Sequence, residues 1–334
     1  MILLAFLGIL LLPFLIVGGL LSLFNRRKRK AILRWTGILF FTSAILMVFG
    51  IGPYLMARLI VNSGTRPMDT LSKDTPAEYQ VPYEDISFET QDHLKLSGWY
   101  IPPGARNAIV VCAHGLFRNR VEMLGRVMPL AGAGYGALLY DSRSHGSSDK
   151  GKVSLGYFER YDVLGAIQHI RKRYQGAEVQ PKIILFGVSM GAVAVMEAAA
   201  ETEDYSAIIL DSPFYSMRET VAHHAWLFLQ MPRYPFPQLF LFWFQRFAGF
   251  DADRVNGHEA LLRMKPVPLL IIASEGDKRI SPDNARALYS EANSESKELH
   301  MFGKDVSHGA AARLHPEEYE EVLLRFLNRA MPGE

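Results

Sequence analysis

The residues best suited to chemistry in this chain are a serine and the two glycines that flank it, in the sequence Gly187-Val-Ser189-Met-Gly191. An apolar run, Ile183–Phe186, precedes them, and a run of small residues, Ala192–Ala200, follows. At a sharp turn from strand to helix a serine hydroxyl is exposed, and small neighbours let the two elements approach closely. The N-terminus of the helix also presents amides where negative charge develops. The pattern predicts that Ser189 is a nucleophile and not merely a structural residue of a turn.

A serine hydroxyl attacks only when a base takes its proton, and a carboxylate must orient that base. His308 lies in a loop, Gly303–Gly309, between the last predicted strand and the last predicted helix. The competing histidines lie in a predicted strand (His300), at the start of the last helix (His315), or in the segment before Pro266 (His223, His224 and His258). We therefore expect His308 to be the base. The chain offers Asp277, Glu275 and Asp211 as acids at the ends of predicted strands.

These residues have to be positioned by a pattern of alternating strands and helices that begins after Val81. The predicted strands are 85–90 and 95–100, which form an opening antiparallel hairpin, followed by 108–112, 137–140, 183–186, 207–210, 269–273 and 298–302. The predicted helices are 121–131, 157–174, 192–200, 282–292 and 316–329. Short apolar runs separated by helical periodicity predict an α/β fold with a mostly parallel sheet and helices on both faces.

The alternation is interrupted between about residues 212 and 265, where aromatic residues are dense. An inserted helical cap over the C-terminal edge of the sheet accounts for this segment. Gly132, Gly134 and Gly136 precede a predicted strand instead of following one, so they do not predict a dinucleotide site. The sequence contains no phosphate-binding motif and no metal motif, and we expect no cofactor and no metal.

With these motifs the chain resembles the α/β-hydrolase superfamily, and within it the esterase and lipase-like proteins described as serine-aminopeptidase-like hydrolases. The resemblance covers roughly Tyr83 to the end. It implies that His114-Gly115 ends the strand before the first crossover, and that the backbone amides of Leu116 and Met190 form the oxyanion hole. It also implies that Asp277 is the orienting acid, with Asp211 as the rival because some hydrolases of this fold use that strand.

A second segment carries the resemblance, the loop from Asp141 to Ser148. It is similar to the Asp-x-Arg-Gly-x-Gly-x-Ser segment of the family, but Ser144 stands where glycine is usual. The role of this segment in the family is mainly structural. We therefore assign no chemistry to Asp141, Arg143 or His145.

The N-terminal part of the chain has a different composition. Residues 2–24 are apolar and uncharged, and a second apolar stretch covers about residues 35–57, so each is long enough to cross a bilayer. A basic run, Arg26–Lys30 with Arg34, separates them and is predicted to form a short cytoplasmic loop. Residues 1–61 are therefore predicted to be a transmembrane hairpin, with the following domain on the extracytoplasmic side of the cell membrane.

Residues 62–81 are polar and contain Pro67 and Pro76, so they are predicted to be a tether, and residues 82–334 to be the hydrolase domain. The formal net charge of +2 indicates no nucleic-acid partner. Cys112 is the only cysteine in the sequence, which excludes an intrachain disulfide.

Three functions follow as hypotheses. The first is a serine hydrolase that cleaves an ester, thioester or amide through an acyl-enzyme, with a small-molecule or lipid acyl substrate near a membrane. The second is a peptidase of the same fold, which would need acidic cap residues such as Glu219, Asp251, Asp253 or Glu259 to bind a substrate amino group. The third is a membrane scaffold that keeps the fold without the activity.

Overall fold

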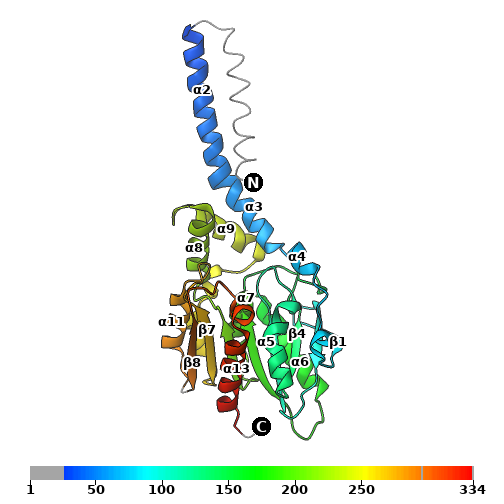
Figure 1. Cartoon of the computed structure of the whole chain (residues 1–334). Coiled ribbons are helices and arrows are strands. Elements are labelled where there is room, and N and C mark those ends of the chain that lie inside the picture. The colour runs from blue at the N-terminus through cyan, green and yellow to red at the C-terminus, as the bar shows by residue number, and fades with distance from the viewer. Residues whose placement is uncertain (1–25, 295, 333–334) are drawn as a thin grey trace.

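The computed structural model describes residues 26–294 and 296–332. Its centre is an eight-stranded sheet with the order β1-β2-β4-β3-β5-β6-β7-β8 (Figure 1). The strands are β1 Glu84–Glu89, β2 Lys95–Ile101, β3 Ala108–Ala113, β4 Gly136–Tyr140, β5 Lys182–Val188, β6 Ala207–Asp211, β7 Leu269–Ser274 and β8 Lys297–Phe302. Strand β2 pairs antiparallel with β1 and β4, and the remaining pairs are parallel.

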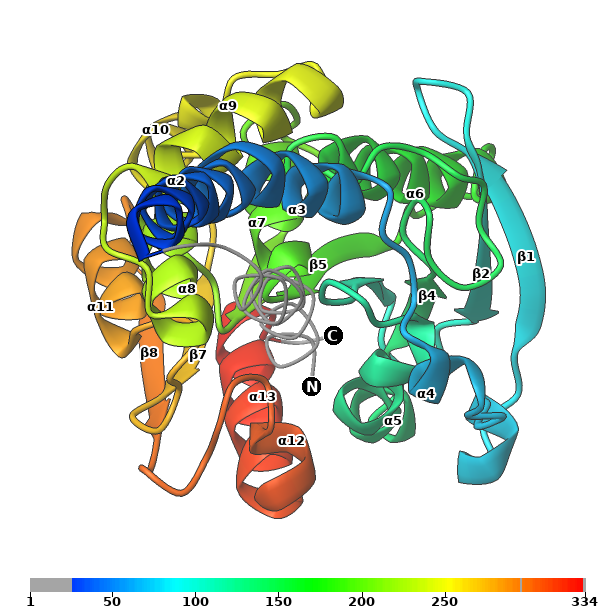
Figure 2. The same ribbon diagram turned by 90° about the horizontal axis from the view of Figure 1, so that it is seen from above.

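Helices cover both faces of this sheet (Figure 2). They are α5 Leu124–Gly132, α6 Glu159–Arg173, α7 Met190–Ala199, α11 Pro282–Glu291, α12 Ala311–Leu314 and α13 Pro316–Ala330. Helices α6, α7 and α11 belong to one apolar cluster, and α5 and α13 belong to a second cluster on the other face. Each β-α-β crossover moves the chain along the sheet, so loops distant in sequence meet at the C-terminal strand ends. The predicted α/β-hydrolase fold is confirmed.

The apolar sequences of the central strands match their burial in the sheet. Every residue of β3, β4, β6 and β7 is buried, so their apolar runs are covered on both faces. The outer strand β1 alternates instead, with only Phe88 fully buried. These two patterns match the difference between a central and an edge strand.

The predicted cap is present between β6 and β7. It consists of α8 Met217–Leu229, α9 Phe236–Ala248, a short 3-10 helix Ala252–Arg254 and α10 Gly257–Arg263. Aromatic side chains on one face of α9, including Phe240 and Phe244, are buried against the domain. Others in the cap are more than half exposed, namely Trp226, Phe228, Tyr234 and Phe242. The cap's aromatic residues thus serve both its own core and its outer surface.

One long helix leads into the domain. It comprises α2 Arg26–Ile45, a π-helical turn Leu46–Ile51 and α3 Gly52–Val61, and it projects away from the sheet in Figure 1. Residues Lys28–Val61 are long and apolar enough to span a membrane. Their most apolar 18-residue stretch is almost unburied, whereas Pro53, Ala57 and Val61 of α3 are buried. The basic run was predicted as a loop, which is wrong: α2 begins at Arg26, so these residues form its first turns. The first predicted crossing, residues 2–24, lies outside the described residues.

The segment predicted as a tether has structure of its own. It contains α4 Pro67–Thr70 and a 3-10 helix Pro76–Tyr79. The backbone of Val61 accepts a hydrogen bond from the amide of Val153, and Arg66 donates one to the carbonyl of Phe117. The chain between the long helix and β1 is therefore bound to the surface of the domain.

Candidate active site

Ser189 lies at the turn between β5 and α7 in a conformation that few residues other than glycine adopt. Its φ and ψ angles are 55° and −115°. Its amide donates to the carbonyl of Asp211 at 2.8 Å. A Cβ atom at Gly187 or Gly191 would lie less than 3.0 Å from neighbouring backbone, in the case of Gly191 from the carbonyls of Ala113 and His114. The two glycines are thus required for this turn, as the sequence pattern predicts.

A chain of hydrogen bonds connects the three predicted side chains. The distance from Ser189 Oγ to His308 Nε2 is 2.9 Å, and from His308 Nδ1 to Asp277 Oδ2 it is 2.6 Å. Ser189 is half-buried, and the side chain of His308 is 14 % exposed. The Nδ1 proton is therefore directed to the carboxylate, which leaves Nε2 to accept the serine proton.

The carboxylate of Asp277 is held on its other side by backbone. Its Oδ1 accepts hydrogen bonds from the amides of Arg279 and Ile280 at 2.8 and 2.9 Å. The residue is 7 % exposed. Because both oxygens have partners, the carboxylate cannot rotate away from the imidazole without losing these bonds.

Two consecutive histidines of the cap helix α8 bind the loop that follows β7 and carries Asp277, here called the acid loop. His223 Nε2 donates to the carbonyl of Lys278 at 2.8 Å, and His224 Nε2 donates to that of Arg279 at 3.0 Å. Burial lowers the pKa of His224 to about 4, so its imidazole is neutral near pH 7. The sequence places both histidines in the cap but gives no signal that they reach the loop after β7.

The rival acid, Asp211, has other partners. Its carboxylate accepts hydrogen bonds from Arg126 Nε at 3.1 Å, Tyr319 Oη at 2.8 Å and Ser212 Oγ at 2.9 Å. No hydrogen bond to His308 is present among the described residues. Asp211 therefore lies beneath the serine turn and supports it, whereas Asp277 contacts the imidazole.

The two amides expected to bind an oxyanion have no acceptor in the part of the chain that the structure describes. The amides on either side of Leu116 are occupied, since Gly115 donates to Glu122 Oε2 at 2.7 Å and Phe117 donates to His145 Nε2 at 3.2 Å. Gly115 also lies against Ser189: a Cβ placed on it would be 3.6 Å from Ser189 Cβ. The free amides of Leu116 and Met190 thus lie on the two segments that meet at the serine.

The segment from Asp141 to Ser148 is structural, in agreement with the prediction. Asp141 accepts bonds from the amides of Arg120 and Ser147 at 2.8 and 2.9 Å. Burial, with a contribution from His114, lowers the pKa of His145 to about 3, so its Nε2 remains an acceptor for Phe117. Ser144 has a φ angle of 66°, which explains why glycine is the usual residue there.

Sequence reasoning missed Arg126, a buried cation on α5 beneath the site. Its guanidinium bonds to Asp211, to the carbonyl of Glu122 at 2.9 Å and to the carbonyl of Gly309 at 2.7 Å. Burial acts to lower the pKa of Arg126, but the Asp211 carboxylate raises it, and the side chain stays charged. Arg126 thus connects the loop that follows His308, the aspartate beneath the serine turn and the 3-10 helix Arg120–Met123 that precedes α5. A lone arginine within an apolar helix was the available signal.

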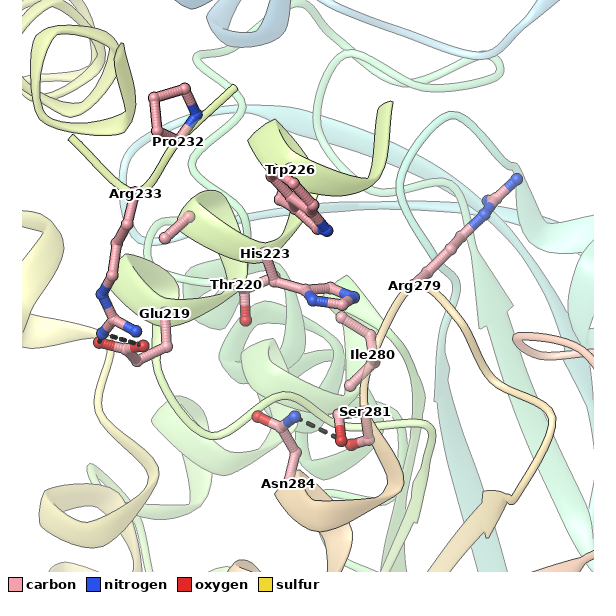
Figure 3. Close-up of a pocket in the computed structure, with 11 residues that line it drawn as sticks. Glu219, Thr220, His223, Trp226, Pro232, Arg233, Arg279, Ile280, Ser281 and Asn284 are labelled. Atoms are coloured by element: carbon pink, nitrogen blue, oxygen red, sulfur yellow. Dashed lines mark hydrogen bonds and ion pairs between the residues drawn. The ribbon is translucent and has the colours of Figure 1, made fainter. Parts of the chain in front are cut away.

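A cavity of about 480 Å³ lies next to this arrangement, between α8 and the acid loop (Figure 3). It is lined by Trp226, His223 and Ile280 among others, and not by Ser189 or His308. Figure 3 shows Arg233 paired with Glu219 at one side of the cavity. The cavity therefore adjoins the hydrogen-bonded chain without containing it.

The histidines that compete with His308 have other partners. His300 pairs with Glu318, His315 with Asp305 and His258 with Glu291. Across residues 26–294 and 296–332, no group of three or more histidine, cysteine, aspartate or glutamate side chains is arranged to hold a metal ion.

Comparison with known proteins agrees with this fold. Residues 104–248 match the family described as "Serine aminopeptidase, S33". Protein YfhR of Escherichia coli (strain K12) is 27% identical over 296 residues, covering 86% of this chain and 94% of its own. Protein bem46 of Schizosaccharomyces pombe is 22% identical over 240 residues, covering 69% of this chain and 72% of its own.

Among solved structures, an esterase of Pyrococcus furiosus is similar, with a TM-score of 0.64 at 24% identity, covering 79% of this chain and 97% of the esterase. An acylaminoacyl peptidase of Pyrococcus horikoshii has a TM-score of 0.57 at 18% identity, covering 78% of this chain and 44% of the peptidase. The chain therefore has the α/β-hydrolase fold, and its residues 104–248 are similar to the serine aminopeptidase family of that fold.

We expect Gly191→Ala to destabilise the protein, because the added methyl would overlap the end of β3. Overpacking of this kind costs about 1–3 kcal/mol. Thermal unfolding of the detergent-solubilised chain measures the effect, with Gly132→Ala as the control, since a Cβ at Gly132 meets nothing within 4 Å. Equal midpoints for the two variants would contradict the close approach at Ser189.

Asp277→Asn and Asp211→Asn should separate the two acids. We expect Asp277→Asn to retain its stability and lose ester turnover by about 10⁴-fold, because the imidazole loses its orienting carboxylate. Asp211→Asn leaves Arg126 buried without its ion pair, so it should lower stability by about 3–5 kcal/mol while its folded fraction keeps most turnover. Kinetics and unfolding on both variants measure this, and a reversed pattern would make Asp211 the acid.

Proposed function

We propose that the protein is a serine hydrolase that cleaves carboxylic esters through an acyl-enzyme, with Ser189, His308 and Asp277 as its catalytic residues. The observation that carries the proposal is the pair of hydrogen bonds from Ser189 Oγ to His308 Nε2 and from His308 Nδ1 to Asp277. This series of hydrogen bonds links a nucleophile, a base and an acid that orients the base, which is the arrangement that nucleophilic catalysis requires.

In this mechanism Ser189 Oγ attacks the carbonyl carbon while His308 Nε2 takes its proton. Asp277 stabilises the imidazolium through the Nδ1–H bond, and the amides of Leu116 and Met190 receive the oxyanion. The imidazolium then protonates the leaving alcohol, and the ester carbon remains bonded to Oγ. Water, deprotonated by His308, then attacks the acyl carbon. The bond from that carbon to Ser189 Oγ breaks, the carboxylic acid leaves, and the imidazolium returns its proton to Oγ.

A peptidase is the second candidate, since the matched family is described as serine aminopeptidase. Three of the four acidic side chains of the cap argue for an ester, and the fourth, the exposed Glu259, does not line the cavity beside the loop that carries Asp277. Glu219 is paired with Arg233, and Asp253 with Arg218, so both charges already have a partner. Asp251 accepts a bond from the amide of Asp253 at 3.0 Å. These carboxylates are therefore poorly placed to bind the amino terminus of a peptide.

We further propose that the substrate is lipophilic and is taken near a membrane. Trp226 lines the cavity beside the acid loop and is 57% exposed, and Phe228 on the same helix is 60% exposed. The apolar α3 packs against cap helix α9, with Tyr54 edge-on to Trp243 at 5.1 Å. A bilayer that holds the long helix would thus lie on the cap's side of the domain.

The anchor is proposed to place the domain on the extracytoplasmic side of the cell membrane. The described helix carries most of its basic residues near its start, with Arg58 in its last turn, and the hydrolase domain follows that last turn. By the positive-inside tendency the basic end is cytoplasmic. We propose in addition that the apolar residues 2–24 cross the membrane as well, which makes the protein multi-pass.

Ser189 should react with a fluorophosphonate probe in the full-length protein, and Ser189→Ala should abolish the labelling. We expect turnover of p-nitrophenyl esters to exceed that of amino-acid arylamides, with the preferred acyl length found from a series of esters. Persistent labelling of Ser189→Ala would remove this serine from the mechanism. Faster turnover of arylamides would favour the peptidase, and a folded protein that reacts with neither would favour a non-catalytic scaffold.

A single new cysteine tests the orientation, because Cys112 is buried and burial raises the pKa of its thiol. Val179, which is 67% exposed, is a suitable position. We expect Val179→Cys to react with a membrane-impermeant maleimide in cells whose outer envelope has been permeabilised while the cell membrane is still sealed. The unsubstituted chain is the control. Labelling only after the cell membrane is permeabilised would place the domain in the cytoplasm.

A further inference from the structure

The segment that leaves the long helix passes directly over the loop that carries one oxyanion amide. We call residues Thr65–Asp69 the strap and residues Gly115–Asn119 the oxyanion loop. Arg66 donates its amide to the carbonyl of Phe117 at 3.0 Å, and Thr65 Oγ1 donates to the carbonyl of Arg118 at 2.8 Å. Figure 2 shows the chain running from α3 to α4 across the domain.

Asp69 makes the strongest contacts of the strap. Its carboxylate receives Arg118 Nη1 at 2.9 and 3.0 Å and Arg66 Nε at 2.6 Å. Its backbone carbonyl accepts a bond from Asn119 Nδ2 at 3.1 Å. The Asp69 side chain is 20% exposed, so these charge-assisted bonds are partly shielded from water.

The same interactions continue to the amides of the oxyanion loop. Arg118 Nε donates to Glu122 Oε1 at 3.0 Å, and the other oxygen of Glu122 accepts the amide of Gly115 at 2.7 Å. Asp69 is thus connected through Arg118 and Glu122 to the residue before Leu116. The strap also holds the carbonyl of the residue after it, Phe117. Both neighbours of Leu116 are fixed, and its own amide is left free.

The path of the strap leaves little freedom for it to lie elsewhere. A Cβ atom at Gly64 would be 2.6 Å from the carbonyl oxygen of Ser144. Thr65 Oγ1, which donates to the oxyanion loop, also accepts the amide of Gly146 at 2.8 Å. The strap is therefore bound to the Asp141–Ser148 segment on one side and to the oxyanion loop on the other.

We propose that the strap is a positioning element of the active site, in which Asp69 holds the oxyanion loop so that the Leu116 amide is directed at the reacting carbonyl. The strap then positions a group of the catalytic centre and also connects the domain to the membrane anchor. The catalytic part of this inference rests on the proposed function.

Asp69→Ala in the full-length protein tests the inference, with Asp74→Ala as the matched control. Asp74 is an exposed carboxylate of the same segment that bonds only to Ser72 among the described residues. An oxyanion donor acts chiefly in the transition state, so we expect Asp69→Ala to lower kcat with little change in KM. The loss of kcat should be about 10-fold, which is smaller than the ~100-fold or more that complete removal of an oxyanion donor costs. Asp69→Glu, which keeps the charge, should restore part of it.

Hydrogen exchange provides a second measurement that needs no turnover. Amides of the peptide containing Gly115–Asn119 should exchange faster in Asp69→Ala than in Asp74→Ala, while α13 is unchanged. If Asp69→Ala does not fold, Thr65→Val, which removes one hydroxyl from the strap, should give the same two effects in milder form.

Unchanged exchange in the oxyanion loop, or a kcat equal to that of Asp74→Ala, would overturn the inference. A rise in KM with unchanged kcat in Asp69→Ala would also contradict a positioning role. If the unsubstituted protein turns over no ester, the proposed function fails, and the exchange measurement still decides whether the strap holds the loop.

Discussion

The position of the Ser189 hydroxyl, on which the hydrogen bonds to His308 and Asp277 depend, is set by the close approach of β5, α7 and the end of β3. Ser189 can keep its positive φ angle only because Gly187 and Gly191 have no side chains to collide with the adjoining backbone. That turn directs Oγ outward while the serine amide is bound to the carbonyl of Asp211. With the hydroxyl fixed in this way, the loops carrying His308 and Asp277 need only converge on it from the same edge of the sheet.

A buried polar layer beneath the turn provides that convergence. Arg126 bonds to Asp211 and to the carbonyl of Gly309, next to the base. Tyr319 completes the layer through its bond to Asp211, and burial raises the pKa of its hydroxyl, which stays protonated. A buried charge without its partner is costly, so these contacts are strongly interdependent. The cap histidines act on the acid loop from the opposite side.

Much of this could be predicted from sequence. All eight strands could be predicted because buried parallel strands form short apolar runs. The positions of Ser189 and His308 after strands make them candidates, whereas Asp277 is favoured over Asp211 by the family resemblance, and the structure joins these three side chains by hydrogen bonds. What could not be predicted depends on contacts between distant residues. Arg126 and Gly309 are far apart in the chain, as are Asp69 and Arg118, and no local pattern pairs them. The basic run at Arg26 was misassigned because a charged stretch between apolar segments resembles a loop, although its residues are good helix formers.

The central claim is that Ser189 forms a covalent acyl intermediate with the help of His308. Rapid mixing of the full-length protein with an activated p-nitrophenyl ester tests it most directly. We expect a burst of p-nitrophenolate stoichiometric with enzyme, an acyl adduct on the peptide containing Ser189, and loss of both in His308→Ala. An adduct on another residue, or ester turnover undiminished in that variant, would contradict it.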